Sequence, residues 1–193
     1  MAMNQAKTLT RAQFKHLMRQ VMKRPDAIQC LTILAFSFKC GLRASEIAQL
    51  RWKDVTDAEG NVLPVGNFIT LPSNITKGSV DGVVVMHKMV HGCLVALQKQ
   101  HPKSSRLFTG RFGKPLTPNA LTVYLYRLFS DVGFSGCSSH SGRRTFITNL
   151  ARVCNDMECS LADVQKLARH KNLKTTELYI DLSKRVADLS QSI

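Results

Sequence analysis

The sequence predicts a mainly α-helical fold of the α+β class, in which one small antiparallel β-sheet is inserted between helices. Three observations carry this prediction. Apolar residues recur at helical spacing from residue 10 to about residue 53, and helical spacing resumes at about residue 89. Between these two regions, β-branched and aromatic residues gather in two short runs separated by turn residues. A length of 193 residues suits one domain of ordinary size.

Three helices are expected before the sheet. Thr10 can cap the first, whose apolar positions follow the 3.6-residue period. Asp26 can cap a second helix over 27–40, which is apolar nearly all round and is therefore expected to be buried. Gly41 would end that helix, and a short helix over 42–52 follows directly. These helices would form much of the core.

The runs NFITLP (67–72) and GVVVMH (82–87) are the expected strands, and the turn between them carries Lys77. Helices are then expected at 89–100, 118–129, 140–153, 160–170 and 173–182. Thr117 and Pro118 would start the helix over 118–129, and a Ser160-x-x-Asp163 capping box would start the helix over 160–170.

The formal charge is +14 and the pI is about 9.9. Residues 1–24 hold six Lys or Arg and no acid, and residues 82–130 hold seven and no acid. A polyanion is the expected partner, because Lys and Arg contacts with phosphates supply most non-specific nucleic-acid affinity. The chain has no apolar run long enough for a membrane span and no export signal, so we expect a cytosolic protein with no membrane partner.

Six cysteines are scattered without a C-x-x-C pair, and we expect them to be reduced. GRFGKP has the wrong spacing for a phosphate-binding loop, and it lacks the Ser or Thr after the lysine. His87 and His91 have the spacing of a zinc helix, but Lys88 stands where a zinc protease needs glutamate. Neither stretch predicts a cofactor, and the expectation is that there is no metal site.

A set of short motifs occurs in a fixed order along the chain. GLRASEI precedes the sheet, TKG lies in the turn between the strands, HSGRRTF opens a later helix, and a histidine and a tyrosine nine residues apart follow. Each motif alone is common. Together they resemble the tyrosine recombinase (phage integrase) family, with these candidate catalytic residues: Arg43, Lys77, His140, Arg143, His170 and Tyr179.

The resemblance implies an enzyme that cuts and rejoins DNA through a 3′-phosphotyrosine, with no metal and no ATP. The two arginines would hold the non-bridging phosphate oxygens and Tyr179 would be the nucleophile. By the same resemblance, His140 is the base, His170 donates to a phosphate oxygen, and Lys77 protonates the departing 5′ oxygen. Glu46 is a supporting residue, and the expected further DNA contacts are Arg144, Arg169, Lys171 and Lys174.

The resemblance further implies double-stranded DNA as partner, a tetramer assembled on it, and a bacterial, phage or mobile-element origin. We expect a single catalytic domain over 1–193, with its core at about 8–185, a tail at 186–193 that docks on a neighbouring protomer, and no N-terminal core-binding domain. Arg169 departs from the family, which usually has glycine before the second histidine. Two alternatives stay open: a non-catalytic DNA-binding module of the same fold, and a type IB topoisomerase-like enzyme.

Overall fold

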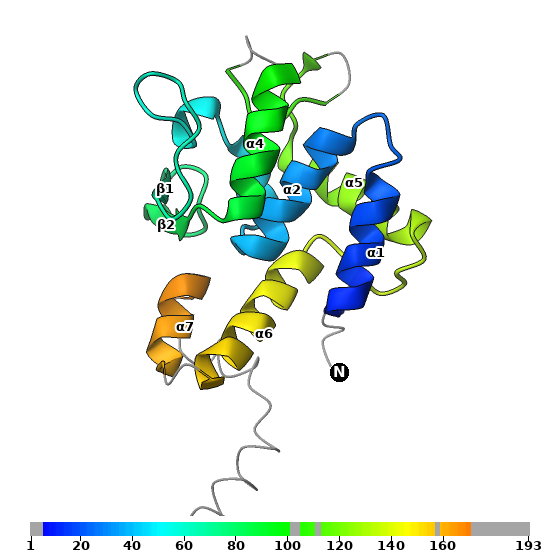
Figure 1. Ribbon diagram of the computed structural model, residues 1–193, viewed down its shortest axis with the longest axis vertical. Helices are drawn as coiled ribbons and strands as arrows, with labels where there is room; N and C mark the ends of the chain where they lie inside the picture. Colours follow the sequence, from blue (N-terminus) through cyan, green and yellow to red (C-terminus); the bar gives the residue numbers. More distant parts are fainter. Residues whose placement is uncertain (1–5, 101–104, 111–112, 157–158, 171–193) are drawn as a thin grey trace, which may run out of the picture. The chain divides into compact units, whose positions relative to one another are not determined.

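A computed structural model describes residues 6–100, 105–110, 113–156 and 159–170. The chain divides into two compact units, Met1–Phe146 and Ile147–Ile193. The elements follow one another in the predicted order (Figure 1): α1 Arg11–Val21, α2 Ala27–Lys39, α3 Ala44–Gln49, the 3-10 turn η1 Trp52–Asp54, β1 Phe68–Leu71, β2 Gly82–Val85, α4 Lys88–Gln100, α5 Pro118–Asp131, α6 Ser141–Asp156 and α7 Leu161–Ala168. The mainly helical fold with one small sheet is confirmed.

The start of α1 is fixed by local hydrogen bonds, as predicted. The Thr10 side chain accepts from the Gln13 amide, and the Gln13 side chain accepts from the Thr10 amide, which completes a capping box. The Asp26 prediction is wrong, because its carboxylate makes no cap bond. It accepts instead from Arg24 at 3.1 Å and from the Tyr124 hydroxyl at 2.7 Å, so a tertiary contact replaces the local one.

Helix α2 is the centre of the first unit and is buried on most of its surface, as its composition predicts. It packs against α1, α3 and α4, while α3 packs against α5. Phe36, Ile33 and Leu34 of α2 are almost completely buried. Each such side chain contributes about 1.5–3 kcal/mol by leaving water. This packing fixes the end of α2, from which the GLR turn starts.

Strands β1 and β2 pair antiparallel, with Phe68 opposite Val85 and Ile69 opposite Val84. Ile69 and Val84 are buried, whereas Phe68 and Val85 are exposed, so the sheet covers the core with one face. The prediction of a two-stranded hairpin around the TKG turn is confirmed.

The second unit, as far as the structure describes it, has a small core of its own. Ala151, Cys154 and Val164 are buried there, with Leu150 and Leu161 packed against them. Helix α7 starts at the predicted capping box, in which the Ser160 side chain accepts from the Asp163 amide. The helix predicted over 173–182 lies outside the described residues.

The expectation that all six cysteines are reduced is wrong for one pair. Cys154 and Cys159 form a disulfide, with Cα atoms 5.0 Å apart, which is within the range that a disulfide can bridge. Cys30, Cys40, Cys93 and Cys137 are not disulfide-bonded. Among the described residues, no helix combines the length and the apolar character that crossing a membrane requires.

Candidate functional site

Arg43 is held at the start of α3 by a buried carboxylate. Glu46 is fully buried, and its two oxygens accept from the Arg43 backbone amide at 2.7 Å and from the Arg43 guanidinium at 2.8 Å. The Arg43 side chain keeps 25% of its surface exposed. Glu46 therefore fixes both the backbone and the guanidinium of Arg43, while part of the Arg43 side chain stays exposed.

Arg143, which is close to the C-terminal limit of the first unit in sequence, contacts the same turn. Its guanidinium donates to the backbone carbonyl of Gly41 at 2.5 Å, two residues before Arg43. Arg143 is only 7% exposed and lies in the first turn of α6. The structure thus brings the GLR turn and the H-x-x-R helix start together, across 102 residues of sequence.

His140 stands immediately before α6 and is exposed. Its Nδ1 lies 3.4 Å from the Ser139 hydroxyl, and its backbone carbonyl accepts from the Arg144 amide at 2.9 Å. Arg144, a predicted DNA contact, is half-buried in the first turn of the helix. The backbone N–H groups of a helix start favour an anion, so His140 stands where a phosphate would be attracted.

Lys77 is exposed in the turn between β1 and β2, as predicted. That turn is shaped by its own hydrogen bonds: the Asp81 carboxylate accepts from the Ser73 amide at 2.7 Å, and the Thr76 hydroxyl donates to the Ser73 carbonyl at 3.1 Å. Ile75 is buried beneath it. The hydrogen-bonded turn therefore presents a lysine whose long side chain extends into solvent.

His170 follows α7 in the second unit. Its backbone amide donates to the Gln165 carbonyl at 3.1 Å, and its carbonyl accepts from the Gln165 side chain at 3.0 Å. Arg169, just before it, is half-buried and has φ +52°, a left-handed conformation that favours glycine. Tyr179, Lys171 and Lys174 lie outside the described residues, and their predicted roles stay predictions.

Two glycines next to the candidate residues were not among the predicted site residues. Gly41 has φ +65°, and a Cβ there would lie 2.4 Å from the Phe146 ring. A Cβ on Gly142 would lie 2.1 Å from the Ser37 hydroxyl oxygen. Both positions therefore need glycine, so that α6 can start against the end of α2. The sequence signal was present, since each of the two motifs contains a glycine, but only the packing shows which atoms lie against it.

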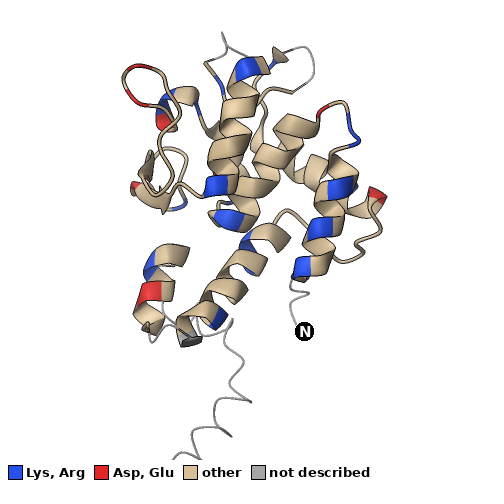
Figure 2. Ribbon diagram, viewed as in Figure 1, with Lys and Arg blue, Asp and Glu red and all other residues tan. Residues whose placement is uncertain are grey.

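The first unit can thus bind an anion with two guanidinium groups, a helix start and an exposed imidazole. Figure 2 shows the basic positions among the described residues, including those at the start of α6 and at the end of α2. Planar guanidinium groups match phosphate oxygens two at a time, so the arrangement suits a phosphodiester better than a single carboxylate.

Comparisons with known proteins point to one family. The phage integrase family model matches residues 7–185. A tyrosine recombinase XerC of Lactobacillus delbrueckii subsp. bulgaricus is 24% identical over 169 residues, which cover 83% of this chain and 52% of the relative. The chain thus spans about half the length of the curated relatives that it matches.

Solved structures show the same fold. The XerH site-specific recombinase bound to its difH substrate matches with a TM-score of 0.75 at 21% identity, over 97% of this chain and 54% of that one. The Tn1549 transposon integrase in complex with transposon right end DNA matches with a TM-score of 0.73 at 17% identity. The match covers 95% of this chain and 65% of the integrase chain. Since the family model covers nearly the whole sequence, the chain belongs to the phage integrase family.

Proposed function

We propose that this chain is the catalytic part of a site-specific DNA recombinase, which cuts and rejoins DNA strands through a 3′-phosphotyrosine. The observation that carries the proposal is the bond from Arg143 to the Gly41 carbonyl, which joins the two arginine motifs at one turn. Membership of the phage integrase family and the likeness to recombinases and integrases solved with DNA support it.

In this proposal the Tyr179 hydroxyl attacks the phosphorus of the scissile phosphodiester, and the bond to the 5′ oxygen breaks. His140 takes the phenol proton and Lys77 gives a proton to the departing 5′ oxygen. Negative charge grows on the non-bridging oxygens during the attack, and the guanidinium groups of Arg43 and Arg143 neutralise it. A preorganised donor of this kind contributes about 3–4 kcal/mol to the transition state.

In this proposal His170 donates to a non-bridging oxygen of the scissile phosphate. The 3′-phosphotyrosine keeps one phosphoester bond in place of another, so a 5′-hydroxyl of a second strand can reverse the reaction without an external energy source. Both proton transfers run backwards in that step. The same residues therefore cut and rejoin, which is what recombination between two DNA segments requires.

The proposal is tested by trapping the covalent intermediate. The protein is incubated with nicked duplexes that tile the DNA on either side of its gene. A nick just downstream of the cut lets the short fragment that carries the new 5′-hydroxyl diffuse away, so that rejoining cannot occur. We expect one or a few duplexes to give a protein–DNA adduct that survives heating in detergent and is released by protease. The absence of an adduct from every duplex, with the protein folded and bound to DNA, would overturn the proposal.

A further inference from the structure

Helix α1 carries a row of basic residues that the candidate site does not use. Arg11, Lys15 and Arg19 recur at every fourth position, and all three are exposed. Residues four apart lie on the same side of a helix, about 6 Å apart along its axis. The three side chains, here named the α1 basic row, therefore form one stripe about 12 Å long.

The α1 basic row has no acidic counterpart in the part of the chain that the structure describes. Helix α1 contains no Asp or Glu, as Figure 2 shows, and none of the three side chains forms an ion pair with a described residue. Three positive charges in line repel one another, and an isolated helix loses stability from like charges at this spacing. A bound polyanion would remove that cost.

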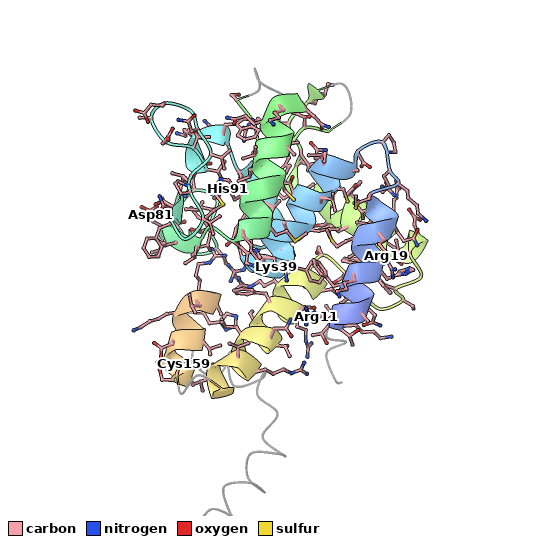
Figure 3. All side chains as sticks on the ribbon, viewed as in Figure 1. Arg11, Arg19, Lys39, Asp81, His91 and Cys159 are labelled. Carbon is pink, nitrogen blue, oxygen red and sulfur yellow. A yellow bond between two sulfur atoms is a disulfide. The ribbon has the colours of Figure 1, made fainter. Side chains whose placement is uncertain are left out.

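The row begins beside the candidate site. The Leu9 amide, two residues before Arg11, donates to the Thr145 hydroxyl of α6 at 2.9 Å, and Thr145 lies two residues after Arg143. On the side of α2, the Lys39 ammonium lies 5.0 Å from the centre of the Phe14 ring, and Lys39 lies two residues before Gly41. In Figure 3, Arg11 and Arg19 lie toward opposite ends of α1. Lys39 thus places one positive charge against α1, close in sequence to the GLR turn.

We propose that the α1 basic row binds the sugar–phosphate backbone of duplex DNA beside the phosphate held at the candidate site. The inference rests on the proposed function in one respect, which is that it takes DNA as the polyanion. Each DNA strand carries a phosphate about every 3.4 Å along the axis, so a stripe of about 12 Å spans several phosphates. Contacts of this kind set position and affinity but do not read base sequence.

The test is the salt dependence of equilibrium binding to a duplex of arbitrary sequence, in the Tyr179→Phe background so that no cutting interferes. The triple variant Arg11→Gln, Lys15→Gln, Arg19→Gln is compared with the parent. Because each phosphate contact contributes about 0.9 to the slope of log K against log salt, we expect the slope to become less steep by about 2–3. Affinity at 0.1 M salt should fall by roughly tenfold or more, equally for two unrelated sequences.

A matched variant removes three exposed lysines of the same unit that lie off α1: Lys53→Gln, Lys99→Gln and Lys114→Gln. It changes the net charge by the same amount, and we expect its slope to stay within one unit of the parent. An unchanged slope in the α1 variant, or an equal change in both variants, would overturn the inference. Circular dichroism checks that α1 remains folded, which is expected because the replaced side chains are exposed.

The two proposals fail separately. An active chain that forms the covalent adduct while the α1 variant keeps the parent slope contradicts the α1 inference alone. A chain that shows the slope change but forms no adduct on any duplex contradicts the proposed function and leaves the α1 basic row as a DNA-binding surface.

Discussion

Arg43 and Arg143 are held by different groups, although both are assigned to the same phosphate. Arg143 donates to the Gly41 carbonyl, which carries no formal charge, whereas Arg43 pairs with the buried carboxylate of Glu46. The motif GLRASEI predicted Arg43 as a site residue, and the spacing R-x-x-E predicted Glu46 as its partner. The Gly41 contact was not predictable, because it joins residues 102 apart through packing alone.

At the residue scale, Glu46→Gln is expected to slow adduct formation by roughly tenfold or more, because it removes the charge that orients the Arg43 guanidinium. It should also lower the free energy of unfolding by about 1–3 kcal/mol, since a buried charge-assisted bond is weakened. The rate is measured on nicked duplex and the stability in urea. Arg51 and Asp54 offer a matched control, because the Asp54 carboxylate accepts from the Arg51 amide at 2.8 Å in the same R-x-x-acid arrangement, and neither is a candidate site residue.

We expect Asp54→Asn to leave the rate of adduct formation unchanged. Equal losses of rate in Glu46→Gln and Asp54→Asn would show that the Glu46 effect comes from general destabilisation and would contradict its role in placing Arg43.

At the scale of elements, helix starts were the most predictable feature, because a cap is a local hydrogen bond between residues two or three apart. Thr10, Thr117 and Ser160 cap α1, α5 and α7 as their sequences indicate. The predicted cap by Asp26 is absent because its carboxylate accepts from the Tyr124 hydroxyl, 98 residues away in sequence. The Cys154–Cys159 disulfide was not predicted, because the spacing of the two cysteines matches no pairing rule in the sequence.

Helix α4 is capped by a histidine, which makes its stability depend on pH. The Met89 amide donates to Nδ1 of His87 at 3.0 Å, so the ring must be neutral there. Burial, together with the positive charges of Lys39 and Lys88, lowers the pKa of His87 below its usual value near 6.5. The unfolded chain therefore takes up this proton first, and the stability that the cap contributes above pH 6.5 is lost as the pH falls below that value.

We expect His87→Asn to keep the cap and to lose this part of the pH dependence, which amounts to about 1 kcal/mol between pH 7 and 5. Urea unfolding at the two pH values measures it. His91→Asn, one turn further along α4, is the control and should retain the decrease seen in the parent. A decrease of the same size in His87→Asn would contradict the cap.

Helix α7 ends at a residue with a left-handed backbone conformation, which is unfavourable for any side chain larger than that of glycine. Arg169 has φ +52° at the C-cap, where glycine has no steric cost. Arg169→Gly is therefore expected to raise the free energy of unfolding by about 1 kcal/mol. Lys166→Gly, inside the same helix, should lower it by about 1 kcal/mol. Thermal unfolding of both variants decides the point: a loss of stability in Arg169→Gly as large as that in Lys166→Gly would show that the arginine side chain contributes more than its conformation costs.

At the scale of the whole molecule, the sequence predicts the order of elements because each follows from its own periodicity and its neighbouring turn residues. It also predicts which motifs belong to the site, because their order is specific to one family. What brings the GLR and H-x-x-R motifs together is the close approach of the start of α6 to the end of α2, which Gly41 and Gly142 permit. That approach depends on side-chain volumes in three dimensions, and no local pattern contains it.

The central claim is that Tyr179 is the nucleophile, and the chain contains two other tyrosines that serve as matched controls. Tyr126 has an exposed phenol on α5, whereas the Tyr124 hydroxyl donates to Asp26 inside the first unit. The direct measurement is adduct formation on nicked duplex by Tyr179→Phe, Tyr126→Phe and Tyr124→Phe, with mass spectrometry of the nucleotide-bearing peptide. We expect only Tyr179→Phe to abolish the adduct, and we expect the nucleotide to be attached to Tyr179. An adduct that persists in Tyr179→Phe, or a nucleotide on another residue, would contradict it.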